Sequence, residues 1–161
     1  MNAEPLIRRI VKAANSAKLE MIVIGNAGAA LGGATVTTLD FDFYVRDTEK
    51  QMPKIRAFAH ELEAVVIPAD SPLSNAVKVE NEKAGIFIDL IDRPEGIAGF
   101  AAVRRRATEL RTNGRSSCVY VANLKDIIAS KKKLGRPKDL AVLPILELAL
   151  DEQEKNNKTE T

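Results

Sequence analysis

Hydrophobic positions along the chain change repeatedly between helical and strand-like spacing. Residues 4–18 and 48–64 place apolar side chains on one helical face, with spacings of three and four residues. Residues 21–24 and 86–91 are short and almost continuously apolar, as is typical of buried strands. The pattern predicts helices over residues 4–18, 26–33, 48–64, 96–106 and 124–134 and a last one to about residue 150, and strands over 21–24, 37–45, 76–79, 86–91, 108–111 and 117–121.

Turn signals separate these elements. Asn113-Gly114 between two strand patterns predicts a hairpin, and Asn123 is placed to cap the helix that follows it. A break at residues 68–72 and another at 135–137 each contain proline. We expect a single α/β domain over residues 1–150, with a mixed β-sheet flanked by helices and a helical C-terminal part, followed by a mobile polar tail over residues 151–161.

Composition limits the chemistry. Apolar residues make up 45% of the 161 residues, and 24 basic against 22 acidic residues give a net charge of +2, so a strongly basic nucleic-acid-binding protein is not indicated. The only cysteine, Cys118, excludes a disulfide framework, and the only histidine, His60, excludes a histidine metal cage. Neither a membrane span nor a signal peptide is predicted, so the expected location is the cytoplasm. Catalysis would have to use carboxylates, lysine and arginine, with a bound metal ion as helper.

Two acidic residues alternate with aromatic ones in the strand predicted over residues 37–45. Phe41 and Phe43 would enter the core, while Asp40 and Asp42 would share the opposite face, roughly 6–7 Å apart at Cα. Adjacent carboxylates repel one another and need solvent, a proton or a cation. Mg²⁺ accepts such an oxygen-only ligand set, especially with substrate phosphates. The alternative is a polar strand face in contact with water.

Two neighbouring features give this pair a context. Gly25 ends the preceding strand and opens a helix of small residues, so its backbone can approach a phosphate; close packing of helix on sheet is the alternative. Asp89 lies inside the apolar strand 86–91, where an isolated charge is costly. If the two strands are neighbours, Asp89 joins Asp40 and Asp42, and three such carboxylates are typical of a two-metal phosphoryl-transfer site.

A lysine is predicted to point toward the domain interior. At about 100° per residue, Lys131 falls within the apolar stripe of its helix, whereas Lys133 faces solvent. An inward ammonium group needs an anionic partner, which Asp139 on the next helix or a nucleotide phosphate could supply. Alternatively, the side chain of Lys131 extends past the core to water. A run of arginines at 104–106, with Arg111 and Arg115, is a solvated face or a guide for a polyanionic acceptor.

Together these residues resemble a known pattern. The chain is similar to the DNA polymerase β-type nucleotidyltransferase superfamily, and in particular to compact bacterial members such as the abortive-infection and toxin–antitoxin nucleotidyltransferases. The resemblance covers roughly residues 21–146 and is carried by Gly25-Asn26, Asp40-Phe41-Asp42, Asp89, Ser130-Lys131 and the segment 135–140. Asn26 departs from the pattern, because the family has a second small residue at that position.

The resemblance implies a function and a site. The protein would transfer a nucleoside monophosphate from an NTP to a hydroxyl of RNA or protein, as the toxin of a toxin–antitoxin system with a cognate antitoxin. The implied ligands of Mg²⁺ or Mn²⁺ are Asp40, Asp42 and Asp89, with Lys131 as a further catalytic residue. The implied nucleotide-binding residues are Gly25, Asn26, Thr38, Lys131 and Asp139. Two alternatives stay open: a non-catalytic nucleotide-binding or partner protein of the same fold, and a two-metal nuclease.

Overall fold

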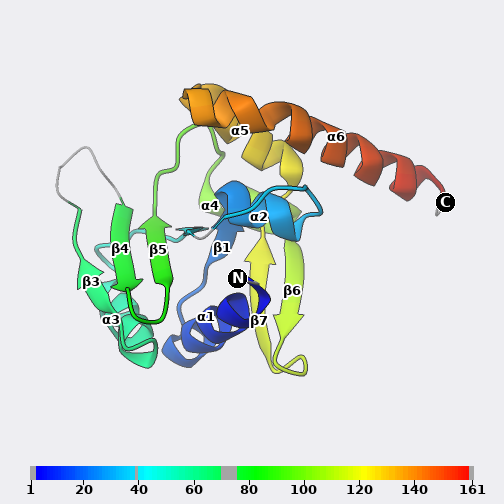
Figure 1. Ribbon diagram of the computed structural model, residues 1–161. Helices are drawn as coiled ribbons and strands as arrows, with labels where there is room; N and C mark the ends of the chain where they lie inside the picture. Colours follow the sequence, from blue (N-terminus) through cyan, green and yellow to red (C-terminus); the bar gives the residue numbers. More distant parts are fainter. Residues whose placement is uncertain (1–2, 39, 70–75, 160–161) are drawn as a thin grey trace.

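The computed structural model describes residues 3–38, 40–69 and 76–159 (Figure 1). Its helices are α1 (Ala3–Ala17), α2 (Gly25–Leu31), α3 (Met52–Glu61), α4 (Phe100–Arg106), α5 (Leu124–Leu134) and α6 (Pro137–Thr159). Its strands are β1 (Ile22–Ile24), β2 (Phe41–Tyr44), β3 (Val65–Ile67), β4 (Ala76–Asn81), β5 (Ile86–Ile91), β6 (Thr108–Thr112) and β7 (Ser117–Val121).

Within the described residues, the strands form one sheet of seven in the order β3-β4-β5-β2-β1-β7-β6. The pairs β1–β7 and β2–β5 are parallel, and the other neighbours are antiparallel. The predicted α/β class with a mixed sheet is therefore confirmed. The hairpin expected at Asn113-Gly114 is the connection between β6 and β7.

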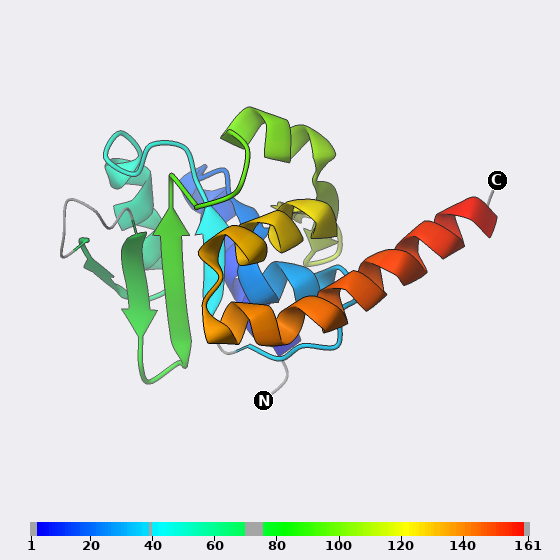
Figure 2. The same ribbon diagram turned by 90° about the horizontal axis from the view of Figure 1, so that it is seen from above.

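Alternation along the central strands divides the core into two clusters. Phe41 and Phe43 of β2 belong to the cluster that contains the buried side chains of α1 and α3. Tyr44 points to the other face and packs in the cluster formed by α4, α5 and α6. Asp42 lies between the two phenylalanines in the sequence, so strand geometry directs it toward the second face. Figure 2 shows α5 and α6 lying over this face of the sheet.

Several predicted elements differ from the structure. In place of the strand expected over residues 37–45, β2 covers Phe41–Tyr44, where both β1 and β5 supply hydrogen-bond partners. Before β2, the Thr38 hydroxyl bonds the backbone of Asp40 and offers a local alternative to strand pairing. The helix expected over residues 48–64 is shorter, and β3 was not predicted. The break expected at residues 68–72 lies partly outside the described residues.

The last helix extends further than its apolar pattern indicates. Helix α6 continues through residue 159 instead of ending near residue 150, so most of the segment expected to be a mobile tail is helical, and residues 160–161 lie outside the described part. Its side chains from Asp151 onward are exposed, and strong helix formers such as glutamate, glutamine and lysine maintain it without a buried face. No described helix, α6 included, combines the length and apolar character needed to cross a membrane.

Helix α5 is defined at both ends and held against the sheet by a loop. The Asn123 side chain accepts a hydrogen bond from the amide of Asp126, and Gly135 ends the helix in the left-handed conformation, as its sequence predicts. The loop after β5 then packs on the helix. The Ser130 hydroxyl donates to the Glu95 carbonyl at 2.7 Å, and a Cβ on Gly96 would lie only 2.5 Å from the Cβ of Lys133.

This contact yields a stability prediction with an internal control. Gly96 and Gly85 both have φ near +70°, but only Gly96 has neighbouring atoms where a Cβ would be. Gly85→Ala should cost about 1 kcal/mol for the left-handed backbone, whereas Gly96→Ala should cost a further 1–3 kcal/mol or so because α5 must move. Urea denaturation of both variants measures the difference. Equal losses would show that the loop does not pack closely on α5.

Candidate active site

Three charged side chains form a row across neighbouring strands. Asp42 of β2 is in register with Asp89 of the parallel strand β5, and Asp89 is in register with Lys78 of the antiparallel strand β4. The sequence left open whether the strands of Asp42 and Asp89 are neighbours, and the structure shows that they are. Since directly paired residues lie about 5 Å apart at Cα, the two carboxylates and the lysine share one small region of the sheet surface.

The surroundings of Asp42 raise the pKa of its carboxyl group well above the ordinary value. The pKa of Asp42 is raised from 3.8 to about 6. Burial is the largest cause, and the negative charges of Asp89 and Asp40 also raise the pKa. Lys131 and Lys138 act in the opposite direction and lower it. A carboxylate in this position is stabilised by a positive charge, and the second half of the chain already brings two lysines toward it.

Gly25 lies directly against Asp42. Its φ is +64°, and a Cβ at this position would lie 2.7 Å from the Asp42 Oδ2 atom. Both the backbone conformation and the space therefore require glycine at this first residue of α2. At the adjacent Asn26, the side-chain Oδ1 atom is buried and has no hydrogen-bond partner among the described residues. An unsatisfied buried acceptor is costly, and none of the described residues compensates it with a hydrogen bond.

Asp40 and Thr38 both lie before β2, outside the strand that carries Asp42. Asp40 is exposed and precedes β2, so it does not share a strand face with Asp42. Among the described residues, no group of three or more histidine, cysteine, aspartate or glutamate side chains is arranged to hold a metal ion. The expected triad of carboxylates is thus present in one region, but its side chains do not converge on one point.

The third carboxylate has a basic partner that the sequence reasoning missed. The Asp89 Oδ1 atom accepts a 3.0 Å hydrogen bond from Lys78 Nζ, and this bond raises the pKa of Lys78. Lys78 is the exposed residue between buried Val77 and Val79. Reading residues 76–81 and 86–91 as one hairpin would have placed it opposite Asp89, so the signal was present in the spacing.

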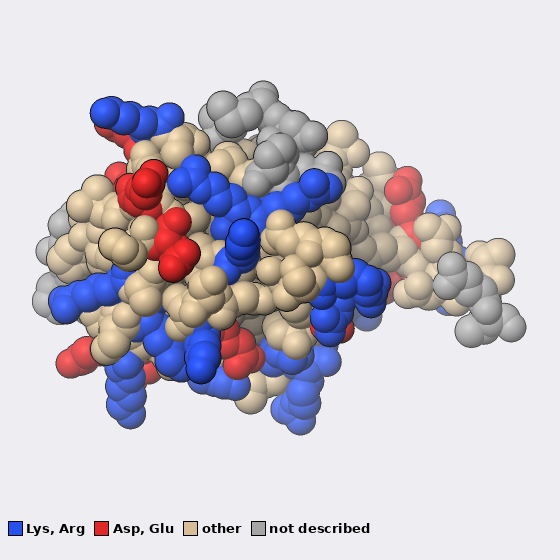
Figure 3. All heavy atoms as spheres, turned by 90° about the horizontal axis from the view of Figure 1, so that it is seen from below, with Lys and Arg blue, Asp and Glu red and all other residues tan. Residues whose placement is uncertain are grey.

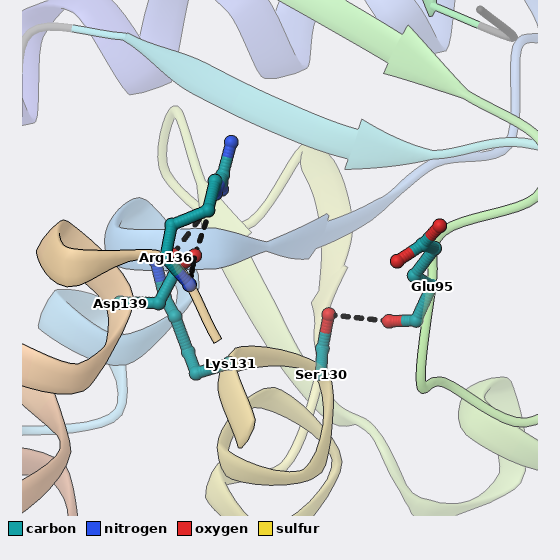
Figure 4. A network of polar contacts seen from close by, with 5 residues as sticks. All are labelled: Glu95, Ser130, Lys131, Arg136 and Asp139. Carbon is teal, nitrogen blue, oxygen red and sulfur yellow. Dashed lines mark hydrogen bonds and ion pairs between the residues drawn. The ribbon is translucent and has the colours of Figure 1, made fainter. Parts of the chain in front are cut away.

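Three residues from the α5–α6 junction form a network (Figure 4), and one of them, Lys131, acts on Asp42 through its charge. The Lys131 ammonium lies 3.4 Å from Asp139 Oδ1, with exposed fractions of 12% for the Lys131 side chain and 0% for that of Asp139. Arg136 Nε donates to Asp139 Oδ2 at 2.6 Å, and these bonds hold the pKa of Asp139 below its usual value. The inward direction of Lys131 and its pairing with Asp139 are confirmed, whereas the contribution of Arg136 was not predicted.

The residues around Asp42 fit a divalent cation chemically. The carboxylates of Asp42 and Asp89 are oxygen donors of like charge, they lie in register on adjacent strands, and the burial of Asp42 makes its charge costly without a positive neighbour. Two carboxylates do not complete an octahedral ligand set. Phosphate oxygens of a substrate are the natural source of the remaining ligands at such a site.

Three of the arginines in this region form ion pairs with acidic side chains. Arg104 pairs with Glu20 and stacks over the ring of Tyr120, and Arg106 pairs with Asp126. Arg111 pairs with Glu109. Figure 3 shows lysine and arginine distributed over the lower face of the molecule with acidic side chains between them. The arginines expected to guide a polyanion therefore serve, for the most part, in local ion pairs.

The pKa of Asp42 predicts the pH dependence of stability in the absence of metal. Since its folded-state pKa of about 6 exceeds the unfolded value of 3.8, the ionised form destabilises the protein fully above pH 6, and this penalty disappears as the pH falls toward 4. Asp42→Asn should therefore be more stable than the parent at pH 7.5 by roughly 2–3 kcal/mol, with the gap closing between pH 6 and 4. Urea denaturation in EDTA measures the gap. The exposed Asp151→Asn variant is the control, and a gap that is constant with pH would contradict the burial of Asp42.

Comparison with known proteins supports the fold. No protein-family model and no curated protein matches the chain. The solution structure of the antibiotic-resistance factor ANT(2'')-Ia is similar, with a TM-score of 0.60 and 14% identity over 96% of this chain and 92% of that one. The crystal structure of ANT(2'')-Ia in complex with adenylyl-2''-tobramycin gives a TM-score of 0.62 and 16% identity over 93% and 90% of the two chains. These two similarities show that the chain described here shares the overall fold of ANT(2'')-Ia.

Proposed function

We propose that this protein is a metal-dependent nucleotidyltransferase that transfers a nucleoside monophosphate from an NTP to an acceptor hydroxyl. The observation that carries the proposal is the register of Asp42 with Asp89 beside Gly25, in a chain with the nucleotidyltransferase fold. A nuclease would also need clustered carboxylates. The close approach of the Gly25 backbone favours the transferase, because cleavage of a phosphodiester does not require a cradle for a triphosphate.

The residues of the site would have separate roles in binding the metal ion, binding the phosphates and accepting a proton. Asp42 and Asp89, with Asp40 from the segment before β2, would hold Mg²⁺ or Mn²⁺, which would polarise the triphosphate and neutralise charge on it. The backbone at Gly25 and Asn26 would hold phosphate oxygens, and Thr38 would be a further nucleotide-binding residue. Asp89 would accept the proton of the attacking hydroxyl.

Lys131 would stabilise the negative charge that develops on the phosphates. Its ammonium is largely buried and is kept in place by the fully buried Asp139, so its position is fixed before the nucleotide binds. Arg136 holds Asp139 from the solvent side and is itself partly exposed. Transfer in such a site depends on positioning and on charge stabilisation, without a covalent enzyme intermediate.

The acceptor in this proposal is a hydroxyl of RNA or protein. The sequence resemblance to toxin–antitoxin nucleotidyltransferases supports that choice and, with it, a growth-inhibitory role relieved by a cognate antitoxin. The complex of ANT(2'')-Ia with adenylyl-2''-tobramycin adds a small-molecule hydroxyl as an acceptor to test.

A non-catalytic nucleotide-binding protein of the same fold is the second candidate. The observation that favours it is the side-chain arrangement, since within the described residues the three carboxylates do not converge and Asp89 is engaged by Lys78. Such a protein would bind an NTP without releasing pyrophosphate. The two candidates therefore differ in turnover and not in binding.

Labelled nucleotides test the proposal directly. We expect incubation with each α-labelled NTP, Mg²⁺, total RNA and cell lysate to place label in RNA, protein or a small molecule, and Asp42→Asn to reduce transfer by at least about a hundredfold while the protein remains folded. Nucleotide binding with no pyrophosphate release would select the non-catalytic candidate. Shortened RNA without label would select the nuclease.

Lys131 gives a prediction with a matched control on the same helix. Lys131→Ala should lower nucleotide affinity or turnover at least tenfold, equivalent to about 1.4 kcal/mol, because a positioned charge is lost. Lys133→Ala should change neither, because this substitution removes the same charge from an exposed position on the other side of α5. Equal effects of the two substitutions on kcat/KM would show that only the overall charge matters.

A further inference from the structure

We propose that Lys78 is a built-in competitor of the divalent cation for Asp89, so that metal binds firmly only together with the nucleotide. This inference rests on the proposed function, because it concerns the same carboxylates. It adds to the site Lys78 of β4, the strand next to the one that carries Asp89, which the resemblance to nucleotidyltransferases does not include.

The position of Lys78 is defined by backbone hydrogen bonding. Strands β4 and β5 form a continuous antiparallel ladder from the pair Ala76–Ile91 to the pair Asn81–Ile86, and the pair Lys78–Asp89 lies in its interior. A shift of one residue would bring Val77 or Val79 to the surface, and both are buried. Lys78 is therefore held opposite Asp89 by the core and not by the ion pair itself.

The ammonium group occupies the place that a cation would take. Lys78 Nζ lies 3.0 Å from Asp89 Oδ1, with exposed fractions of 48% and 33% for the two side chains. On the other side of Asp89, Asp42 is in register and its negative charge also acts on Lys78. The row thus contains two carboxylates and one internal cation, and a divalent ion that binds Asp89 through Oδ1 must first displace the ammonium.

The strength of the pair suits a competitor that can be displaced. A half-exposed ion pair contributes modestly to stability, so it weakens metal binding without preventing it. An NTP brings phosphate oxygens that complete the ligand set of the metal, and the combined complex can displace Lys78 where the metal alone competes poorly. The expected consequence is low metal occupancy without nucleotide and a strong mutual dependence of the two ligands.

Titration with Mn²⁺ alone, followed by the electron paramagnetic resonance signal of free Mn²⁺, tests the inference. Lys78→Met and Lys78→Gln should bind Mn²⁺ at least about threefold more tightly than the parent protein, because the competing charge is gone. Lys78→Arg keeps the charge and should resemble the parent. Lys83→Met removes an equal charge from the exposed β4–β5 turn and should also resemble the parent. Adding Asp89→Asn to Lys78→Met should abolish the gain.

The outcomes separate this inference from the proposed function. A gain confined to the neutral variants of Lys78 and lost with Asp89→Asn supports it, whatever the transfer assay shows. Equal affinity in Lys78→Met and the parent, an equal gain in Lys83→Met, or no Mn²⁺ binding by any variant overturns it. The labelled-nucleotide assay decides the proposed function independently, because transfer by the parent protein would stand in each of these cases.

Discussion

The candidate site of this protein depends on two carboxylates that the sheet holds side by side although their negative charges repel one another. Backbone pairing of β2 with β5 sets Asp42 opposite Asp89, and neither strand can slide, because Phe43 and Leu90 of the next pair are fully buried. The core therefore enforces a proximity that electrostatics opposes. Burial and, after it, the negative charge of Asp89 raise the pKa of Asp42 to about 6.

The surrounding structure supplies positive charge from two directions. Lys78 reaches Asp89 from the neighbouring strand, while Lys131 and Lys138 act on Asp42 from the helical second half. The two sources differ in rigidity: Lys131 is largely buried and anchored by Asp139, whereas Lys78 is about half exposed. A site built in this way has one fixed cationic side, suited to phosphate stabilisation, and one displaceable side, suited to exchange with a metal ion.

The fixed side depends on contacts far from the carboxylates in sequence. Helix α5 is positioned by its caps, by the Ser130–Glu95 hydrogen bond and by the close packing of Gly96 on its last turns. The loop that carries Gly96 follows directly from β5 and packs tightly on α5. The strand of Asp89 and the helix of Lys131 are therefore held together by this packing contact. Gly25 is a second position where close packing requires glycine, because it lets the backbone lie against the Asp42 carboxylate.

The sequence by itself determined the fold class, the central strands, the capping of α5 and the inward direction of Lys131, because these follow from local periodicity and from the few residue types that fit each turn. It also identified Gly25, Asp42 and Asp89 as candidates. Only the tertiary structure decided that Asp40 lies before β2 and that Asp42 and Asp89 are neighbours on adjacent strands. These facts depend on which strands pair and in which register. Hydrophobic spacing constrains one strand at a time and does not specify its neighbour.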